Sequence, residues 1–279
     1  MSKGFWPAVS GSIAQSERLD TIANNLANSD TTGFKKDQVA FRSVMSSAVA
    51  AAQKEDIPRK LYTDKDFHRL DGKDSAFVAV EGTFTDFAQG RAKVTGGPLD
   101  VALEGNGFLE VLGPQGVRYT RQGSLRINNE GGLVTMEGFP VLSAGGQDAP
   151  EGTTVPREEL MARAIRLDPA RGGKLNITTE GRIYQGGQEA AQLSVVEFVD
   201  AKMLSKEGSS LFRNEVPANR SEDPSATMVR QGMLETSNVN AIAEMTELLK
   251  ATRLFEANEK IVRTYGDLES RSVNDLGKL

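Results

Sequence analysis

Residues 240–268 read NAIAEMTELLKATRLFEANEKIVRTYGDL, and this stretch decides the fold of the carboxy-terminal end. It contains one glycine and no proline, so a long helix can run through it. Asn240 is a suitable N-cap, and Glu244 and Glu247 complement the positive end of the helix dipole. We therefore predict a long helix within residues 236–279.

Apolar residues in this predicted helix recur at steps of seven. One set comprises Ala241, Leu248, Phe255 and Val262, a second comprises Leu254, Ile261 and Leu268, and Met245, Leu249 and Tyr265 widen the stripe. Sustained heptad spacing is typical of a coiled-coil seam. An amphipathic helix that lies on its own domain would show the same periodicity, and periodicity alone leaves both interpretations open.

The amino-terminal end predicts a second helix, from about Gly4 to Asn28, within a segment that we bound at residues 1–34. Its apolar residues recur at steps of three and four, and they are Trp6, Val9, Ile13, Leu19, Ile22, Ala23 and Leu26. The turn-forming run 28–33 ends the helix, since Gly33 can adopt a positive φ. Because both ends carry similar stripes, we expect the two helices to pair as a coiled-coil-like stalk.

The middle of the chain has a different pattern. Between Gly72 and Gly187 lie 21 of the 28 glycines, so this region is rich in turns. Apolar residues alternate with polar ones at Val101 and Leu103, Leu109 and Val111, Val117 and Tyr119, Leu125 and Ile127, and Leu133 and Thr135, and again within 175–179, 182–184 and 193–199. We predict an all-β central domain over residues 72–235.

The expected fold class is therefore α+β, with long terminal helices and an all-β centre. Residues 35–71 are interpreted as a linker or extension. We expect Phe34 to Phe41 to be extended and residues 43–52 to be helical or mobile. Residues 150–168 are interpreted as a loop insertion with a short helix from Arg157 to Arg163.

Composition excludes several classes of protein. The chain of 279 residues has a net charge of −5, which argues against a protein that wraps duplex DNA. No run of about 20 apolar residues is present, so we expect no membrane insertion. The start of the chain lacks the apolar run of a cleaved signal peptide, so we do not expect Sec export. Without cysteine, disulfides and thiolate sites are excluded.

Motifs for catalysis or ligand binding fail on inspection. Gly105-Asn106-Gly107 lacks the third glycine of a dinucleotide site, and the run 64–69 lacks the glycine of a calcium loop. His68, the one histidine, is interpreted as a solvated loop residue. Asp100, Glu104 and Glu110 could form a paired-carboxylate hydrolase site, but we favour the solvent face of a sheet. We expect no catalytic residue, no cofactor and no metal site.

Three blocks of sequence resemble the bacterial flagellar basal-body rod and hook protein family. The first is Leu19-Asp20-Thr21-Ile22-Ala23-Asn24-Asn25-Leu26-Ala27-Asn28 followed by Thr32-Gly33-Phe34-Lys35. The second runs from Pro98 to Phe108 and continues through Tyr119-Thr120-Arg121-Gln122-Gly123-Ser124 and Gly132 to Thr135. The third is Glu235-Thr236-Ser237-Asn238-Val239-Asn240.

The resemblance implies a structural subunit of the flagellar rod, not an enzyme. Its terminal helices would pack with neighbouring subunits around a central export channel, in the rod that spans the periplasm. The implied partners are copies of itself, other axial proteins of the rod and hook, and the flagellar type III export apparatus. The segment Phe5 to Gly11 is most similar to proximal rod proteins; distal rod and hook-type subunits are the alternatives. The long segment 150–168 and the pair Leu109-Glu110 depart from the family pattern.

The residues that we expect to serve assembly belong to the first and third blocks and the helical stripes. They are Trp6, Val9, Ile13, Ile22, Asn24, Asn25, Leu26, Asn28, Gly33, Phe34, Asn238, Asn240, Met245, Leu248, Leu249, Phe255, Ile261 and Val262. For Asn24 and Asn25 we favour polar contacts between helices, and for Asn28 a role in ending the first helix.

The pair Phe5 and Val9 resembles the short aromatic–aliphatic export motif of rod and hook substrates. Phe41 and Met45 fit the same pattern, and helix packing explains the first pair equally well. Two other classes compete with the rod interpretation: a secreted β-domain hydrolase or carbohydrate binder, and a different secreted protein with helical ends, such as a translocon tip or adhesin.

Overall fold

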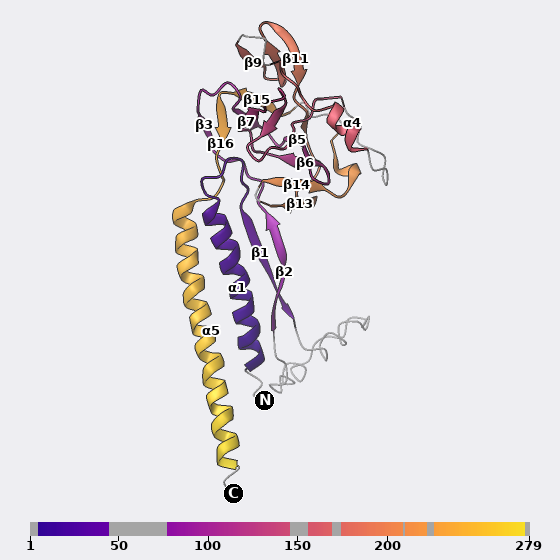
Figure 1. Ribbon diagram of the computed structural model, residues 1–279. Coiled ribbons are helices and arrows are strands. Elements are labelled where there is room, and N and C mark those ends of the chain that lie inside the picture. The colour runs from indigo at the N-terminus through magenta and orange to yellow at the C-terminus, as the bar shows by residue number, and fades with distance from the viewer. Residues whose placement is uncertain are drawn as a thin grey trace, which may run out of the picture. The chain divides into compact units, whose positions relative to one another are not determined.

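The computed structural model describes residues 5–44, 77–145, 156–168, 174–208, 210–221 and 226–276 (Figure 1). The chain divides into two compact units. The helical unit comprises Met1–Leu26, Asp37–Phe84 and Ala241–Leu279, and the β unit comprises Ala27–Lys36 and Thr85–Asn240. The expected α+β class is confirmed, with a helix near each end and a mostly β centre. The expected domain boundaries stay predictions.

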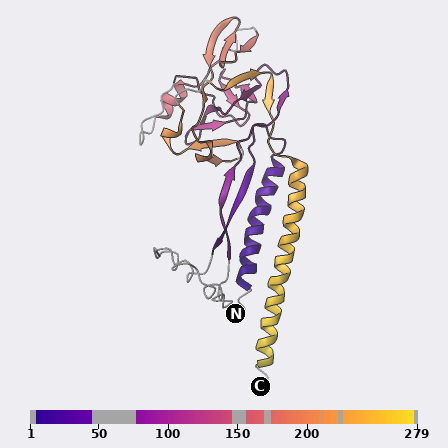
Figure 2. The same cartoon turned by 180° about the vertical axis from the view of Figure 1, so that it is seen from behind.

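Two helices form most of the helical unit. Helix α1 spans Phe5–Ala27, and helix α5 spans Ala241–Leu276 and begins directly after Asn240. They lie side by side and run in opposite directions (Figures 1 and 2). Arg18 of α1 donates to Glu247 of α5 at 2.8 Å, and a Cβ placed on Gly11 would lie 3.2 Å from the Asn258 amide nitrogen. Within the described residues, no helix is long and apolar enough to cross a membrane.

A two-stranded sheet completes the helical unit. Strand β1 spans Asp37–Val44 and pairs with β2, Phe77–Thr85. The amide of Val78 donates to the Ser10 hydroxyl of α1 at 3.3 Å. Ser43 and Val44 belong to β1, so the assignment of these two residues to a helical or mobile run is wrong. Residues 45–52 of that run, Met45 among them, and His68 lie outside the described residues.

The β unit is built from short strands. They are β3 (Ala92–Val94), β4 (Val101–Glu104), β5 (Phe108–Gly113), β6 (Gly116–Thr120), β7 (Leu125–Ile127), β8 (Leu133–Thr135), β9 (Leu175–Ile177), β10 (Arg182–Gln185), β11 (Gln188–Gln192), β12 (Val195–Val196), β13 (Leu204–Glu207), β14 (Leu211–Asn214), β15 (Met228–Gln231) and β16 (Met233–Glu235). Helix α4 (Arg157–Ala162) and two 3₁₀ turns, Ala201–Met203 and Pro217–Asn219, lie between strands.

Antiparallel pairing organises these strands into several small sheets. The largest has the order β12-β5-β6-β14-β13, and a second has the order β11-β10-β9. Strand β15 pairs with β4, and β16 pairs with β3, so residues near the end of the β unit return to its start. The third sequence block lies beside the second, since Glu235 forms an ion pair with Arg121.

The described part of the β unit contains three apolar clusters. The largest contains Leu109, Leu133 and Val141, none of which is exposed to solvent. The second is mostly aromatic, and its Phe108 and Phe212 pack edge to face with ring centroids 5.7 Å apart. The segment 156–168, expected as part of an insertion, supplies core residues, since Ile165 and Leu167 belong to the largest cluster and Leu160 to the third.

Glu110 lies inside the β unit, which contradicts its expected place on the solvent face of a sheet. Its side chain is fully buried and accepts from Arg163 at 2.8 Å, Arg220 at 3.0 Å and Ser194 at 2.6 Å. Glu104, by contrast, is exposed beside Arg230. The alternation of apolar and polar residues in the sequence predicted that both Glu104 and Glu110 lie on the surface. Such a pattern carries no information on the two arginines that neutralise Glu110.

Candidate functional site

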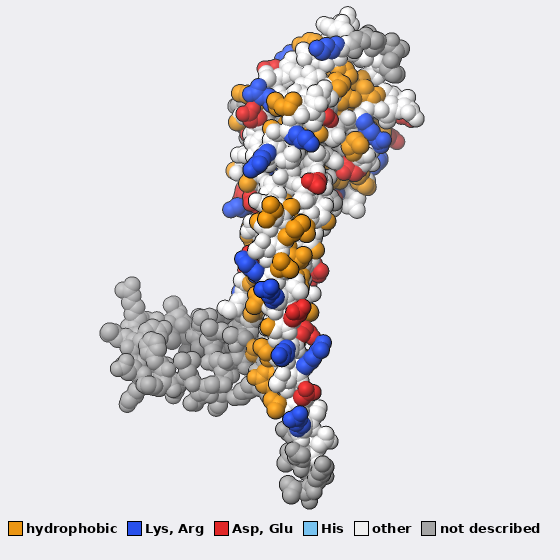
Figure 3. Space-filling model, turned by 90° about the vertical axis from the view of Figure 1, so that its left-hand side faces the viewer, with side chains coloured by type: hydrophobic (Ala, Val, Ile, Leu, Met, Phe, Trp, Pro, Cys, Tyr) orange, Lys and Arg blue, Asp and Glu red, His pale blue; other side chains and the backbone are white. Residues whose placement is uncertain are grey.

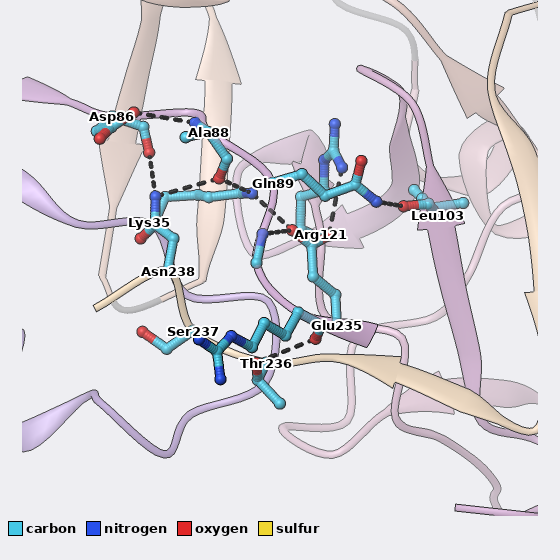
Figure 4. A network of polar contacts seen from close by, with 12 residues as sticks. Lys35, Asp86, Ala88, Gln89, Leu103, Arg121, Glu235, Thr236, Ser237 and Asn238 are labelled. Atoms are coloured by element: carbon cyan, nitrogen blue, oxygen red, sulfur yellow. Dashed lines mark hydrogen bonds and ion pairs between the residues drawn. The ribbon is translucent and has the colours of Figure 1, made fainter. Parts of the chain in front are cut away.

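Three segments from distant parts of the sequence meet in one buried polar network of the β unit. They are the turn 33–36, which follows α1, Arg121 between β6 and β7, and residues 235–238, which lead from β16 toward α5 (Figure 4). We call this arrangement the junction network. Each segment belongs to a different one of the three sequence blocks.

Glu235 is the centre of the junction network. Its carboxylate accepts from Lys35 Nζ at 2.7 Å, from the backbone amide of Gly90 at 2.8 Å and from Arg121 Nη1 at 3.3 Å. The side chains of Lys35, Arg121 and Glu235 are each at most 2% exposed. A carboxylate in this position is stable because two cations and an amide surround it.

The two cations have further partners. Lys35 Nζ donates to the carbonyl of Ala88 at 2.8 Å, and Arg121 Nη2 donates to that of Gly105 at 2.7 Å. The Arg121 guanidinium also lies 4.9 Å from the centre of the Phe108 ring. Burial lowers the pKa of Lys35 below its ordinary value, and the Glu235 carboxylate opposes this; burial lowers the pKa of Arg121 in the same way.

Gly33 allows the first segment to reach the junction network. Its φ is +70°, and an added Cβ would lie 2.4 Å from the backbone carbon of Arg121. Its amide donates to the Glu235 carbonyl at 2.8 Å. A residue with a Cβ at this position would push Arg121 away, because backbone atoms cannot yield as a flexible side chain does.

Phe34 and Asn238 fix the neighbouring backbone. Phe34 is buried, and the Lys206 ammonium lies 3.9 Å from its ring centre while donating to the Lys35 carbonyl at 2.8 Å. The Asn238 side chain accepts from the Lys36 amide at 2.8 Å and donates to the Asp86 carbonyl at 2.8 Å. Asn238 thus joins the turn that follows α1 to the segment that follows β2.

Asn25 makes a similar clasp within the helical unit. Its side chain, in the last turns of α1, donates to the Asp37 carbonyl at 2.8 Å and accepts from the Asp37 amide at 2.9 Å. Asn25 is buried, whereas Asn24 is exposed. The Asn25 amide therefore holds the first residue of β1, a partner that its helical position did not suggest.

The other residues expected to serve assembly differ in exposure. The exposed residues are Trp6, Ile13, Asn240, Met245, Leu249 and Ile261. The half-buried residues are Phe5, Val9, Leu26, Asn28, Leu248, Phe255 and Val262. Ile22 is buried. The structure brings Gly33, Phe34 and Asn238 together around the junction network. Their roles in assembly stay predictions.

Sequence reasoning missed the charged centre of this site. Lys35, Arg121 and Glu235 all stand inside the three blocks, so the blocks held the signal. Charged residues usually lie on the surface, whereas these three are buried. Their contacts join residues as far as 200 positions apart, which no local pattern in the sequence indicates.

Each charged group of the junction network forms an ion pair within the protein, although the buried Arg121 Nε has no hydrogen-bond partner. The arrangement therefore favours holding chain segments in place over binding a ligand. Among the described residues, no group of three or more histidine, cysteine, aspartate or glutamate side chains is placed to hold a metal ion. The site is therefore structural in character: it anchors the segments that enter and leave the two terminal helices.

Models of protein families match three parts of the chain. Residues 7–35 match "Flagella basal body rod protein", 102–185 match "Flagellar hook protein FlgE/F/G D1 domain", and 230–276 match "Flagellar basal body rod FlgEFG protein C-terminal". Lys35, Arg121 and Glu235 fall one in each matched part. The fold and the matches together define a structural protein of the flagellar axis.

Comparison with curated proteins gives the family. The chain is 32% identical to a flagellar basal-body rod protein FlgF of Caulobacter vibrioides, with 100% of both chains covered. It is 30% identical to a flagellar basal-body rod protein FlgG of Bacillus subtilis, over 98% of this chain and 99% of that protein. The chain belongs to the flagellar basal-body rod protein family.

Replacing Glu235 by Gln is expected to lower the free energy of unfolding of the full chain by about 3–5 kcal/mol, because Lys35 and Arg121 would stay buried without a counter-ion. The combined variant Lys35→Met, Arg121→Met and Glu235→Leu removes all three charges and should lose less. Denaturant unfolding of purified protein measures both values.

Glu104→Gln is the matched control, since Glu104 pairs with Arg230 at the surface and its loss should cost no more than about 1 kcal/mol. An equal small loss for Glu235→Gln and Glu104→Gln would show that the junction network does not hold the β unit together.

Replacing Asn25 by Asp removes the donor to the Asp37 carbonyl and sets two oxygens against each other. We expect a loss of about 1–3 kcal/mol and faster hydrogen exchange at the amides of residues 37–39. Asn24→Asp, at the exposed neighbouring position, should leave exchange there unchanged. Identical exchange in both variants would contradict the clasp.

Proposed function

We propose that the chain is a structural subunit of the flagellar rod that assembles through its two terminal helices. It would not be an enzyme, and its partners would be copies of itself and other axial proteins of the rod and hook. Its place would be the basal body. The family membership supports this function, and one feature of the helical unit carries the mode of assembly.

That feature is the apolar surface of α1 and α5. On α5, Ile242 is 79% and Leu249 is 62% exposed, and on α1, Ile13 is 59% exposed. Large apolar side chains at helical spacing favour burial against another protein. If these residues closed the chain's own core they would be covered, and they are open to solvent.

The pairing of α1 with α5 supports the coiled-coil-like stalk as part of this proposal. The heptad set Ala241, Leu248, Phe255 and Val262 is half-buried, and the Arg18–Glu247 pair joins the two helices. In an assembled rod such helices would surround the export channel.

For the position in the rod we propose the proximal part, on the 32% identity to the FlgF relative. The distal part is the second candidate, because the FlgG relative is 30% identical over nearly the whole chain. A hook-type subunit is a third alternative.

Assembly is tested with the double variant Met245→Ser and Leu249→Ser. Each burial contributes about 1.5–3 kcal/mol, so association of the full chain should weaken at least about 100-fold, and cells that carry the variant should lose motility. Sedimentation over a concentration series and swimming assays measure these effects.

Val199→Ser in the β unit is the control, since Val199 is as exposed as Ile242 but lies far along the sequence from both helices. If the double variant Met245→Ser and Leu249→Ser associated and supported motility as the unaltered chain does, assembly through the terminal helices would be contradicted.

We further propose export through the flagellar type III apparatus, with Phe5 and Val9 as the recognised pair. Their replacement by Ala should lower the secreted fraction several-fold and leave the unfolding of the β unit unchanged, as measured by immunoblots of culture supernatants. The control is Phe41→Ala. Normal secretion of the first variant would exclude the pair as the export motif.

A further inference from the structure

Residues 227–238 form a continuous segment of the β unit that contains strands β15 and β16, and we call this segment the strap. Strand β15 pairs with β4, and β16 pairs with β3, each in a sheet of two strands (Figure 1). Within the described residues, β3 and β4 have no other strand partner. A two-stranded sheet has little stability of its own, so both depend on the side chains that the strap brings with it.

The side chain of Gln231 extends the contacts of the strap to a third sheet. Its oxygen accepts from the amide of Ile177 at 3.1 Å, and its nitrogen donates to the carbonyls of Leu175 at 3.1 Å and Pro98 at 2.7 Å. Ile177 and Leu175 belong to β9, the edge strand of the sheet β11-β10-β9. A side-chain amide thus takes the place of a neighbouring strand at this edge.

The strap also supplies two buried groups that its surroundings need. Val229 is 2% exposed and belongs to the largest apolar cluster. Glu235 is the counter-ion of Lys35 and Arg121 (Figure 4). Figure 3 shows charged side chains open to solvent on one face of the molecule, whereas these three are enclosed. If the strap left, an apolar cluster would lose a member and two enclosed cations would lose their anion.

The strap holds the turn that follows α1. The amide of Gly33 donates to the Glu235 carbonyl at 2.8 Å, and the side chain of Asn238 accepts from the Lys36 amide at 2.8 Å. The chain continues from the strap into α5. The strap therefore joins the segment that leaves one terminal helix to the segment that enters the other.

We propose that the strap opens and closes as one unit while the five-stranded sheet stays folded. In the closed state the β unit holds both the turn after α1 and the segment before α5. In the open state it holds neither, so the strap controls whether these two segments are tied to each other. This conformational role goes beyond the rod function and does not depend on it.

Partial opening of the strap is unfavourable, because each of its contacts leaves a buried group without a partner. Departure of Glu235 alone would leave the charges of Lys35 and Arg121 enclosed and unneutralised. Departure of Gln231 alone would leave one amide and two carbonyls without their hydrogen bonds. Opening of the whole strap lets water reach all of these groups at once, so the contacts break together.

The five-stranded sheet has support of its own. In its order β12-β5-β6-β14-β13, the strands β5, β6 and β14 are each paired on both sides, and among the described residues none of its strands pairs with the strap. The second apolar cluster, with Phe108 and Phe212, is likewise formed without a described residue of the strap. The contacts of the strap are therefore expected to open at a lower free energy than this sheet.

Hydrogen exchange of the full chain at low denaturant concentration tests the proposal. The amides of Gly33, Thr95 and Ile177 each donate to a different residue of the strap. We expect these three amides to share one protection factor, about tenfold or more below that of the amides that join β5 to β6. Three unrelated protection factors, or a common value equal to that of β5 and β6, would overturn the strap as a unit.

A disulfide between β4 and β15 adds a second measurement, since the sequence has no cysteine that could interfere. Glu104→Cys and Met228→Cys replace exposed residues that stand opposite each other in these strands. After oxidation, the protection factors of Gly33, Thr95 and Ile177 should rise to those of β5 and β6, because the strap can then open only when the β unit unfolds. Reduction should lower them again. A rise at Thr95 without one at Gly33 would show that the strap does not open as a unit.

The control disulfide joins Ser205→Cys to Arg213→Cys, which stand opposite each other in β13 and β14 of the five-stranded sheet. It should leave Gly33, Thr95 and Ile177 less protected than the amides that join β5 to β6. If this control raised the protection of Gly33 as much as the disulfide across the strap, the effect would not come from the strap, and the proposal would be overturned.

Discussion

The carboxylate of Glu235 is the contact on which the β unit depends. It lies away from water between Lys35 and Arg121, at 2.7 Å and 3.3 Å, and no other described acidic side chain forms an ion pair with either cation. A lone buried charge is costly, so each of the three charges fixes the position of the other two. The backbone segments that carry them are fixed as a result; one of these segments follows α1, and another leads into α5.

A second carboxylate is used in the same way. Glu110 joins Arg163, after α4, to Arg220, after the 3₁₀ turn Pro217–Asn219. In both cases a strand supplies the anion and irregular segments supply the cations. Many strands here have only three or four residues, so backbone pairing alone gives few hydrogen bonds, and buried ion pairs add a geometric requirement that short sheets lack.

The sequence predicted the parts of the fold that follow from local periodicity. Helix α5 and strands such as β5 and β6 were placed correctly, because heptad spacing and alternation of apolar residues are local signals. Strands β3, β15 and β16 were missed, since they are short and depend on partners more than a hundred residues away. The charged centre of the junction was missed for the same reason: the burial of Lys35 follows from a residue at the other end of the β unit.

The span of the Lys35–Glu235 pair has a consequence for the order in which the protein folds. The two residues are 200 positions apart. When the polypeptide emerges amino terminus first, from a ribosome or from a narrow conduit, the Lys35 ammonium group stays in water. It can meet Glu235 only after almost the entire β region has emerged. Closure of the pair is therefore a late event, and until then the turn after the first helix has no ionic anchor. The β unit can therefore be completed only after β16, its last strand, has emerged.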